Sequence, residues 1–202
     1  MKSALLYVVV YLLFMGCCVA MGDTYSFVPP DPDLGDLDHT MYYTWGMDRP
    51  WELEHDGVYE NAAGATLSFN DIWNWDNGPN NLYIHLLNDG PLGITTGWDG
   101  EDHVDAFAGQ GVLLEVYVNL PSTPQDLTYT FSDAEVIALN SYAADGRFAL
   151  AFDPDCHYYN CGVELKVRTE MTQIPEPGAM VLLSAGTVVG VLRYRRRYAR
   201  SH

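Results

Sequence analysis

Short apolar segments separated by turn-forming residues place the strongest constraint on what this chain can fold into. Apolar and polar side chains alternate in residues 82–86 and 113–118, and a period of two is typical of a strand with one buried face. Gly occurs with Asn or Asp between such segments, where turns need these residues. Seven strands are predicted, over residues 40–45, 65–69, 81–87, 111–119, 127–131, 148–152 and 163–168. The pattern predicts an all-β, mainly antiparallel domain of the β-sandwich or jelly-roll type.

One segment breaks the alternation and predicts a short helix. Ser132 and Glu135 have the spacing of a capping box, and apolar residues follow up to Tyr142. Gly146 can adopt the left-handed conformation that ends a helix. We expect this helix to pack across one end of the sandwich.

Three signals follow one another near the C-terminus. The tripeptide Pro175, Glu176 and Pro177 precedes an apolar run over residues 178–192. As a helix, these 15 residues would extend roughly 22 Å, less than the ~30 Å hydrocarbon core of a bilayer. The basic residues that follow resist translocation, so they predict a transmembrane helix over 178–192 and a cytoplasmic tail over 193–202. This tail contains Arg193, Arg195, Arg196 and Arg197.

The C-terminal arrangement resembles the PEP-CTERM sorting signal of bacterial exported proteins, which a membrane-embedded exosortase recognises. Over residues 174–200, the resemblance implies export by the general secretion machinery, tethering to the inner membrane, cleavage near Glu176, and delivery to the cell surface or extracellular matrix. An ordinary C-terminal anchor with a proline-containing stalk is the alternative. Residues 81–88, 109–111 and 152–160 also resemble an uncharacterised exported PEP-CTERM domain, which implies one β-rich unit over residues 81–168.

The N-terminus carries a second export signal. Lys2, an apolar stretch over residues 4–15 and small residues at Cys18 and Ala20 predict a signal peptide over residues 1–20. Lipid attachment at Cys17 is the alternative. The predicted organisation is therefore a signal peptide, an extended or poorly ordered acidic and proline-rich arm over 21–39, a β-sandwich domain over 40–172, and the sorting signal over 173–202.

The region between the export signals is strongly acidic. Residues 21–174 contain 26 Asp and Glu against four Arg and Lys, which argues against nucleic acid as a partner. Cys156 and Cys161 remain once the signal peptide is removed, and their spacing predicts a disulfide in an oxidising compartment. A zinc site here would need two further ligands, and no second Cys pair supplies them.

Two groups of oxygen ligands are candidates for a structural calcium site. The first group surrounds Gly100 and consists of Asp99, Glu101, Asp102 and Asp105. The second group lies beside the predicted disulfide and consists of Asp153, Asp155 and Asn160. The alternatives are a solvated charged loop for the first group, and a stapled turn whose Asp side chains cap local amides for the second. No other cofactor is predicted.

Tryptophans beside the predicted turns are candidates for stacking on sugar rings. Trp73 and Trp75 are two residues apart, which would place both rings on one face of a strand, and Trp98 precedes another turn. Packing into the core is the alternative.

No catalytic motif is present: the sequence lacks Gly-x-Ser-x-Gly, His-Glu-x-x-His and a phosphate-binding Gly loop. We therefore expect a non-enzymatic, exported surface or matrix protein with a structural or adhesive β-sandwich. A carbohydrate-binding module with structural calcium, which binds extracellular polysaccharide, is the second hypothesis. A polysaccharide hydrolase that uses two of the many carboxylates is the third.

Overall fold

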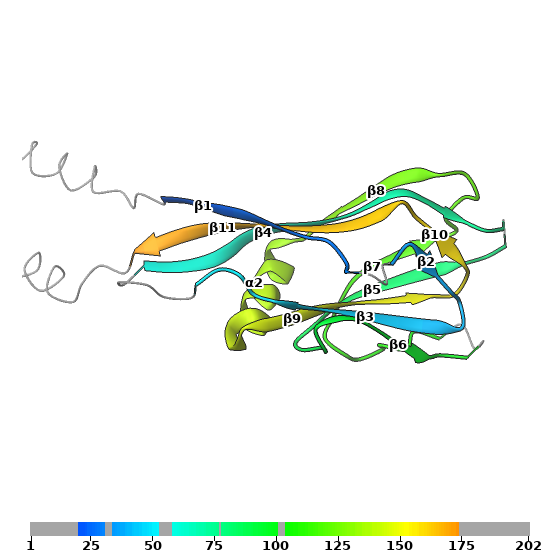
Figure 1. Cartoon of the computed structure of the whole chain (residues 1–202), viewed down its shortest axis with the longest axis horizontal. Helices are drawn as coiled ribbons and strands as arrows, with labels where there is room; N and C mark the ends of the chain where they lie inside the picture. Colours follow the sequence, from blue (N-terminus) through cyan, green and yellow to red (C-terminus); the bar gives the residue numbers. More distant parts are fainter. Residues whose placement is uncertain (1–19, 31–33, 53–57, 77, 101–103, 174–202) are drawn as a thin grey trace, which may run out of the picture.

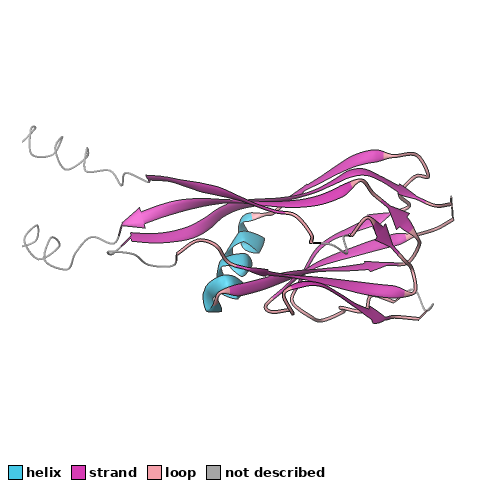
Figure 2. Ribbon diagram, in the orientation of Figure 1, coloured by secondary structure: helices cyan, strands magenta, loops and turns pink. Residues whose placement is uncertain are grey.

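Two antiparallel sheets face one another in the computed structural model, which describes residues 20–30, 34–52, 58–76, 78–100 and 104–173 (Figure 1). The first sheet has the order β1 (Ala20–Phe27), β11 (Gly162–Gln173), β4 (Val58–Asn74), β10 (Tyr158–Tyr159) and β2 (Asp36–Leu37), and β8 (Gln125–Thr130) also pairs with β4. The second sheet has the order β6 (Gly93–Trp98), β3 (Met41–Asp48), β9 (Arg147–Pro154), β5 (Asn81–Leu87) and β7 (Val112–Val118). The α-helix α2 (Asp133–Tyr142) lies between the sheets, and the short 3-10 helix η1 (Ala143–Asp145) follows it (Figure 2).

The core forms between the two sheets from alternate residues of each strand. Ile84 of β5 pairs with Phe152 of β9 in the ladder, and both side chains are fully buried. Phe152 meets Phe69 of β4 edge to face, with ring centroids 5.9 Å apart. Such a contact adds to the free energy gained by removing both rings from water. The layers are therefore joined by large side chains that face inward.

The structure confirms a mainly antiparallel β domain with one short α-helix. Each of the seven predicted strands lies within or overlaps an observed strand, namely β3, β4, β5, β7, β8, β9 and β11. Strands β1, β2, β6 and β10 were not predicted from the sequence. Two of these, β2 and β10, are only two residues long, too short for alternation to show.

The structure differs from the arm expected at residues 21–39. Strand β1 pairs with β11 from Ala20 to Phe27, and Leu34 and Leu37 are buried in the core. Phe27 packs edge to face on Phe148, with centroids 5.7 Å apart. The acidic and proline-rich composition gave no sign of β1, which forms the edge of the sheet next to β11. The described part of the domain therefore includes residues 20–30 and 34–39, which were expected to form an arm.

The described part of the chain contains no helix long and apolar enough to cross a membrane. Residues 1–19 and 174–202, which carry most of the predicted signal peptide and nearly all of the predicted sorting signal, lie outside the described residues.

Helix α2 begins with the predicted capping box. The Ser132 hydroxyl accepts a hydrogen bond from the Glu135 N–H at 3.4 Å, and the Ser132 N–H donates to the Glu135 carboxylate at 2.6 Å. Asn140 then joins the helix to β4, because its side-chain amide accepts from the Ala62 N–H and donates to the Ala62 carbonyl, each at 2.8 Å. Gly146 follows the helical segment with φ 102°, as expected. Helix α2 also contacts β7 and β9, so it closes the space between the sheets.

The Asn140 side chain forms the two backbone hydrogen bonds at Ala62 that a neighbouring strand would otherwise form. We therefore expect its removal to lower stability strongly. Asn140→Ala leaves the buried N–H and C=O of Ala62 without these partners and should lower the free energy of unfolding by about 2 kcal/mol. Ile137→Ala on the same helix is the control, because Ile137 is 70% exposed and its loss should change stability by less than about 0.5 kcal/mol. Urea unfolding of the two variants measures the difference. Equal midpoints would contradict the role of Asn140.

Candidate functional site

A long connection covers the outer face of the second sheet. Residues 99–111, here called the crossover, link β6 at one edge to β7 at the other; residues 101–103 lie outside the described part. Phe107 of the crossover packs on Tyr42 of β3 and on His85 of β5, with ring centroids 5.2 and 5.9 Å apart. The Ala106 N–H donates to the Asp153 carboxylate of β9 at 2.7 Å. The crossover therefore contacts all three central strands.

Asp153 lies buried beneath the crossover. Its side chain is fully removed from solvent, and while Oδ2 accepts from Ala106, no donor among the described residues reaches Oδ1. Burial raises the pKa of Asp153 to about 7, and the negative charges of Asp99 and Asp155 act in the same direction. A buried carboxylate without a donor on one oxygen needs either a proton or a cation.

His85 fixes the crossover from the neighbouring strand. The ring is 2% exposed; Nδ1 lies 3.2 Å from the Gln110 carbonyl oxygen, and Nε2 lies 3.0 Å from Asp105 Oδ2. Because a carbonyl and a carboxylate only accept, both contacts are hydrogen bonds only when the ring is doubly protonated. The other Asp105 oxygen accepts from the Phe107 N–H at 2.9 Å. His85 therefore joins β5 to the crossover through its contacts with Gln110 and Asp105.

Residues from the two predicted groups of calcium ligands lie near one another beneath the crossover. Asp99 and Asp105 come from the crossover, while Asp153 and Asp155 come from β9 and the residues after it. Burial first, and then the charges of Asp155, Asp105 and Asp153, raise the pKa of Tyr83 on β5, as expected when all three carboxylates lie near its hydroxyl. Glu101 and Asp102 lie outside the described residues. The four described carboxylates, here called the acidic site, are near enough to affect one another's charge, but no three of them have ligand atoms all within 4.8 Å of one another.

Asn160 does not belong to the acidic site. Its amide donates to the Leu34 carbonyl at 2.6 Å, and its oxygen accepts from the Gly162 N–H at 3.0 Å. Both bonds face the first sheet, where Asn160 joins the segment before β2 to the start of β11. Asn160 was predicted to join Asp153 and Asp155 because the three are close along the chain. Its side chain instead makes these two hydrogen bonds in the first sheet.

The predicted disulfide between Cys156 and Cys161 is not formed, since both are free thiols in the structure. The residues between them run along β4 instead of closing a loop. The Trp75 N–H donates to the carbonyl of His157, next to Cys156, whereas the Cys161 N–H donates to the carbonyl of Asn70. Five residues of extended strand separate those partners on β4, a span of roughly 16 Å, while a disulfide needs Cα atoms less than about 7 Å apart.

Four aromatic side chains form a continuous outward surface on the first sheet, here called the aromatic face. Trp73 of β4 pairs with Tyr159 of β10, with ring centroids 5.4 Å apart. Trp75 and His157 form the next pair along, at 6.5 Å, and His157 stacks on Tyr159 at 4.9 Å. Trp75 is 62% exposed. Two cross-strand ring pairs therefore lie side by side, with Trp75 exposed and the other three rings half-buried.

The structure resolves the alternatives for the three predicted tryptophans. Asn74, between Trp73 and Trp75, is fully buried, so the alternation of β4 turns both rings outward and away from the core. Trp98 is also exposed, at 71%, but it ends β6 in the other sheet and meets no aromatic ring within the described part of the chain. The sequence alone did not indicate that Tyr159 and His157 lie beside Trp73 and Trp75, because this neighbourhood depends on strand register.

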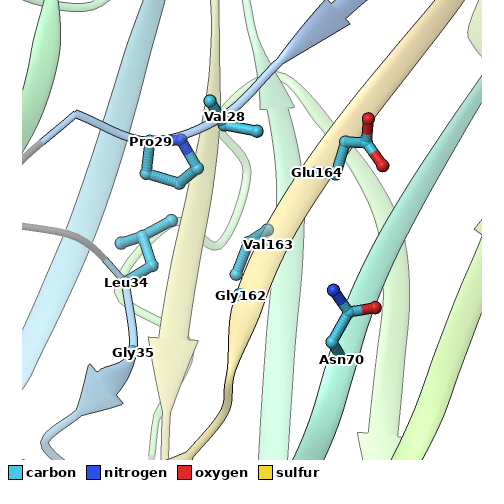
Figure 3. Close-up of a pocket in the computed structure, with 8 residues that line it drawn as sticks. All are labelled: Val28, Pro29, Leu34, Gly35, Asn70, Gly162, Val163 and Glu164. Carbon is cyan, nitrogen blue, oxygen red and sulfur yellow. The ribbon is translucent and has the colours of Figure 1, made fainter.

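A pocket of about 380 Å³ lies between the segment after β1 and the start of β11. Figure 3 shows mainly aliphatic side chains around it, with Glu164 at its border. Glu164 is already engaged by the Ser26 hydroxyl at 2.6 Å and the Lys166 ammonium at 2.8 Å. The pocket therefore offers little chemistry of its own, and we place the candidate site at the aromatic face and the acidic site.

Comparisons with known proteins assign no family to the chain. No family model matches it, and no curated protein matches it significantly. Among solved structures, a latent aurone synthase (polyphenol oxidase) is similar at 8% identity with a TM-score of 0.38, over 70% of this chain and 26% of that one. The K1 cleaved adhesin domain of Lys-gingipain from Porphyromonas gingivalis is similar at 10% identity with a TM-score of 0.29, over 76% of this chain and 100% of that one. This chain spans about a quarter of the length of the aurone synthase, and similarities at these scores support no functional assignment.

The buried Asp153 predicts an unusual dependence of stability on pH. Because its folded pKa, about 7, lies above that of an unfolded Asp, the folded state binds the extra proton between these values, and stability falls as pH rises through that window. Asp153→Asn removes this dependence and keeps an acceptor for Ala106. In EDTA at pH 8 the variant should melt about 4 to 8 °C above the wild type, on the order of 2 kcal/mol, and the difference should shrink towards pH 5. Parallel melting temperatures of the two proteins from pH 5 to 8 would contradict this assignment.

Proposed function

We propose that this chain is an exported, non-catalytic protein of the cell surface or extracellular matrix, and that its aromatic face binds polysaccharide. The observation that carries the proposal is the pairing of Trp73 with Tyr159 and of Trp75 with His157 on an outward surface. Exposed aromatic rings are costly to leave in water without a partner. The apolar C–H face of a pyranose ring is a suitable partner for such flat surfaces.

The charges around the aromatic face favour a neutral polysaccharide. The Asp36 carboxylate contacts Nε2 of His157, and Asp76 follows Trp75 directly. Exposed carboxylates accept hydrogen bonds from sugar hydroxyls, whereas a domain with 26 acidic and four basic residues over 21–174 repels anionic chains. We therefore assign neutral sugars as the ligand class.

A structural calcium ion at the acidic site is part of this proposal. Four carboxylates lie near one another there, and Asp153 Oδ1 lacks a donor among the described residues. Calcium binds several carboxylate oxygens at once and would neutralise charges that otherwise repel one another. Its role would be to hold the crossover on the second sheet, not to contact the ligand.

The positions of the chain ends support surface display. Ala20 of β1 pairs with Met171 of β11, so both ends of the domain leave side by side, while Trp73 pairs with Tyr159 at the opposite end of β4 (Figure 1). An exosortase substrate tethered through residues 178–192 would point its membrane-proximal end inward. The aromatic face would then be at the far end of a strand of 17 residues, or about 55 Å, where extracellular polysaccharide is accessible.

The aromatic face predicts which tryptophan matters for binding. Trp75→Ala should weaken binding to neutral polysaccharides about 10-fold or more, since an aromatic contact and its buried area contribute more than about 1.4 kcal/mol. Trp98→Ala is the matched control, because its side chain is similarly exposed but lies outside the aromatic face. Affinity electrophoresis of the full-length variants against a polysaccharide panel makes the comparison. Equal loss in both variants, no binding by the wild type, or turnover of a bound polysaccharide would contradict the proposal.

The sorting proposal predicts the masses of the native protein. The form in the extracellular fraction should lack the residues before about Met21 and those after Pro175–Pro177, because signal peptidase and exosortase remove them. Intact-mass spectrometry of extracellular and membrane fractions from the native host tests this. A membrane-bound species that keeps residues 193–202 and has no extracellular counterpart would show a permanent anchor instead.

A further inference from the structure

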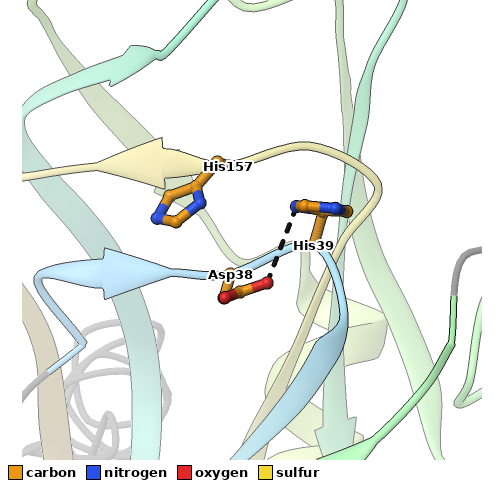
Figure 4. A group of neighbouring side chains, drawn as sticks. All are labelled: Asp38, His39 and His157. Carbon is orange, nitrogen blue, oxygen red and sulfur yellow. Dashed lines mark ion pairs between the residues drawn. The ribbon is translucent and has the colours of Figure 1, made fainter.

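Two histidines and a carboxylate outside the acidic site gather where β2 and β10 meet. Asp38 and His39 follow β2, and His157 precedes β10 (Figure 4). One ligand atom from each of the three side chains lies within 4.8 Å of the others, and Asp38 Oδ1 lies 3.6 Å from His39 Nδ1. Around a tetrahedral zinc ion with bonds of about 2.1 Å, ligand atoms are roughly 3.4 Å apart. The three groups are therefore close to the spacing that one metal ion requires.

We propose that Asp38, His39 and His157 form a binding site for a divalent transition metal of the zinc class. Two imidazole nitrogens and one carboxylate oxygen are donors that suit zinc and its first-row neighbours, whereas calcium and magnesium prefer oxygen ligands alone. Three protein ligands leave a fourth position open to water or to a ligand. The partly exposed position of all three residues gives a metal access from solvent.

Neighbouring groups already hold two of the three ligands in place. Asp38 Oδ1 accepts from the Thr40 N–H at 2.9 Å and from the Thr40 hydroxyl at 2.8 Å, and the Asp38 N–H donates to the Tyr43 hydroxyl at 2.8 Å. These hydrogen bonds orient the carboxylate without a metal.

His157 is oriented in the way that metal-binding histidines commonly are. Its Nε2 contacts the carboxylate of Asp36, and its ring stacks on Tyr159. A carboxylate on one ring nitrogen fixes the tautomer and directs the other nitrogen, here Nδ1, to a metal. Asp36 is thus a positioning residue. A bound metal would also join the two-residue strand β2 to β10, which pair only at Asp36–Tyr159 and Leu37–Tyr158.

The metal site shares His157 with the aromatic face, but its proposal does not rest on polysaccharide binding. Zinc and cobalt are the probes that test it. Isothermal titration of the full-length chain with zinc, in the presence of millimolar calcium to occupy hard-cation sites, should give one site. Cobalt should give the visible absorption of a tetrahedral complex. His39→Ala should abolish both signals, and Asp36→Asn should weaken zinc binding about 10- to 100-fold. Ile137→Ala, an exposed position on helix α2 away from the three ligands, should leave both signals unchanged.

The His39→Ala variant distinguishes zinc binding at this site from zinc binding elsewhere on the chain. His39 lies on a loop and forms none of the core contacts, so its substitution should leave the melting temperature in EDTA unchanged and a loss of metal cannot be ascribed to unfolding. Retention of zinc affinity and of the cobalt spectrum in His39→Ala would overturn the proposal. So would a wild-type chain that binds neither metal, whatever its affinity for polysaccharide.

Discussion

The antiparallel pairing of β4 with β11 is the interaction on which the rest of the structure depends. The two strands pair from Val58–Gln173 to Asn70–Gly162, and each then supports another element: β1 pairs with β11, and β8 with the other edge of β4. This pairing places both ends of the described domain at one end of the sandwich. It also carries Trp73 and Asn74 to the opposite end, where β10 continues the sheet. The separation between possible tether and candidate binding surface is therefore a property of one pair of long strands.

The outer face of the second sheet is also buried, because the crossover packs on it. The acidic site lies beneath this segment. Phe107 covers Tyr42 and His85, and polar contacts at Asp153 and Asp105 fix the position of the segment. Burying a polar group costs free energy unless it forms hydrogen bonds, so polar groups under a loop are stable only when each has a partner. Beneath the crossover, Asp153 Oδ1 lacks a hydrogen-bond partner among the described residues, and this atom marks the acidic site.

Local sequence pattern predicted the parts of the fold that depend on local physics. Alternation located the strands around Leu86 and Val116, and the Ser132–Glu135 spacing located the helix. Predictions based on proximity along the chain were less successful: Cys156 and Cys161 are separated by pairing along β4, and Asn160 bonds to Leu34 instead of joining Asp153. The meeting of Asp99 with Asp153, and of Trp73 with Tyr159, depends on sheet order and register. Those are set by long-range packing, which a single sequence does not display.

The measurement that tests this account most directly is hydrogen–deuterium exchange of the crossover amides, residues 104–110, in the full-length chain at pH 8. If the Asp153 carboxylate and a cation hold the crossover on the second sheet, millimolar calcium should slow exchange at Ala106 and its neighbours in the wild type and have no such effect in Asp153→Asn. Exchange that is the same with calcium and with EDTA in both proteins would contradict the account, because the crossover would then be held without any need to neutralise the carboxylates beneath it.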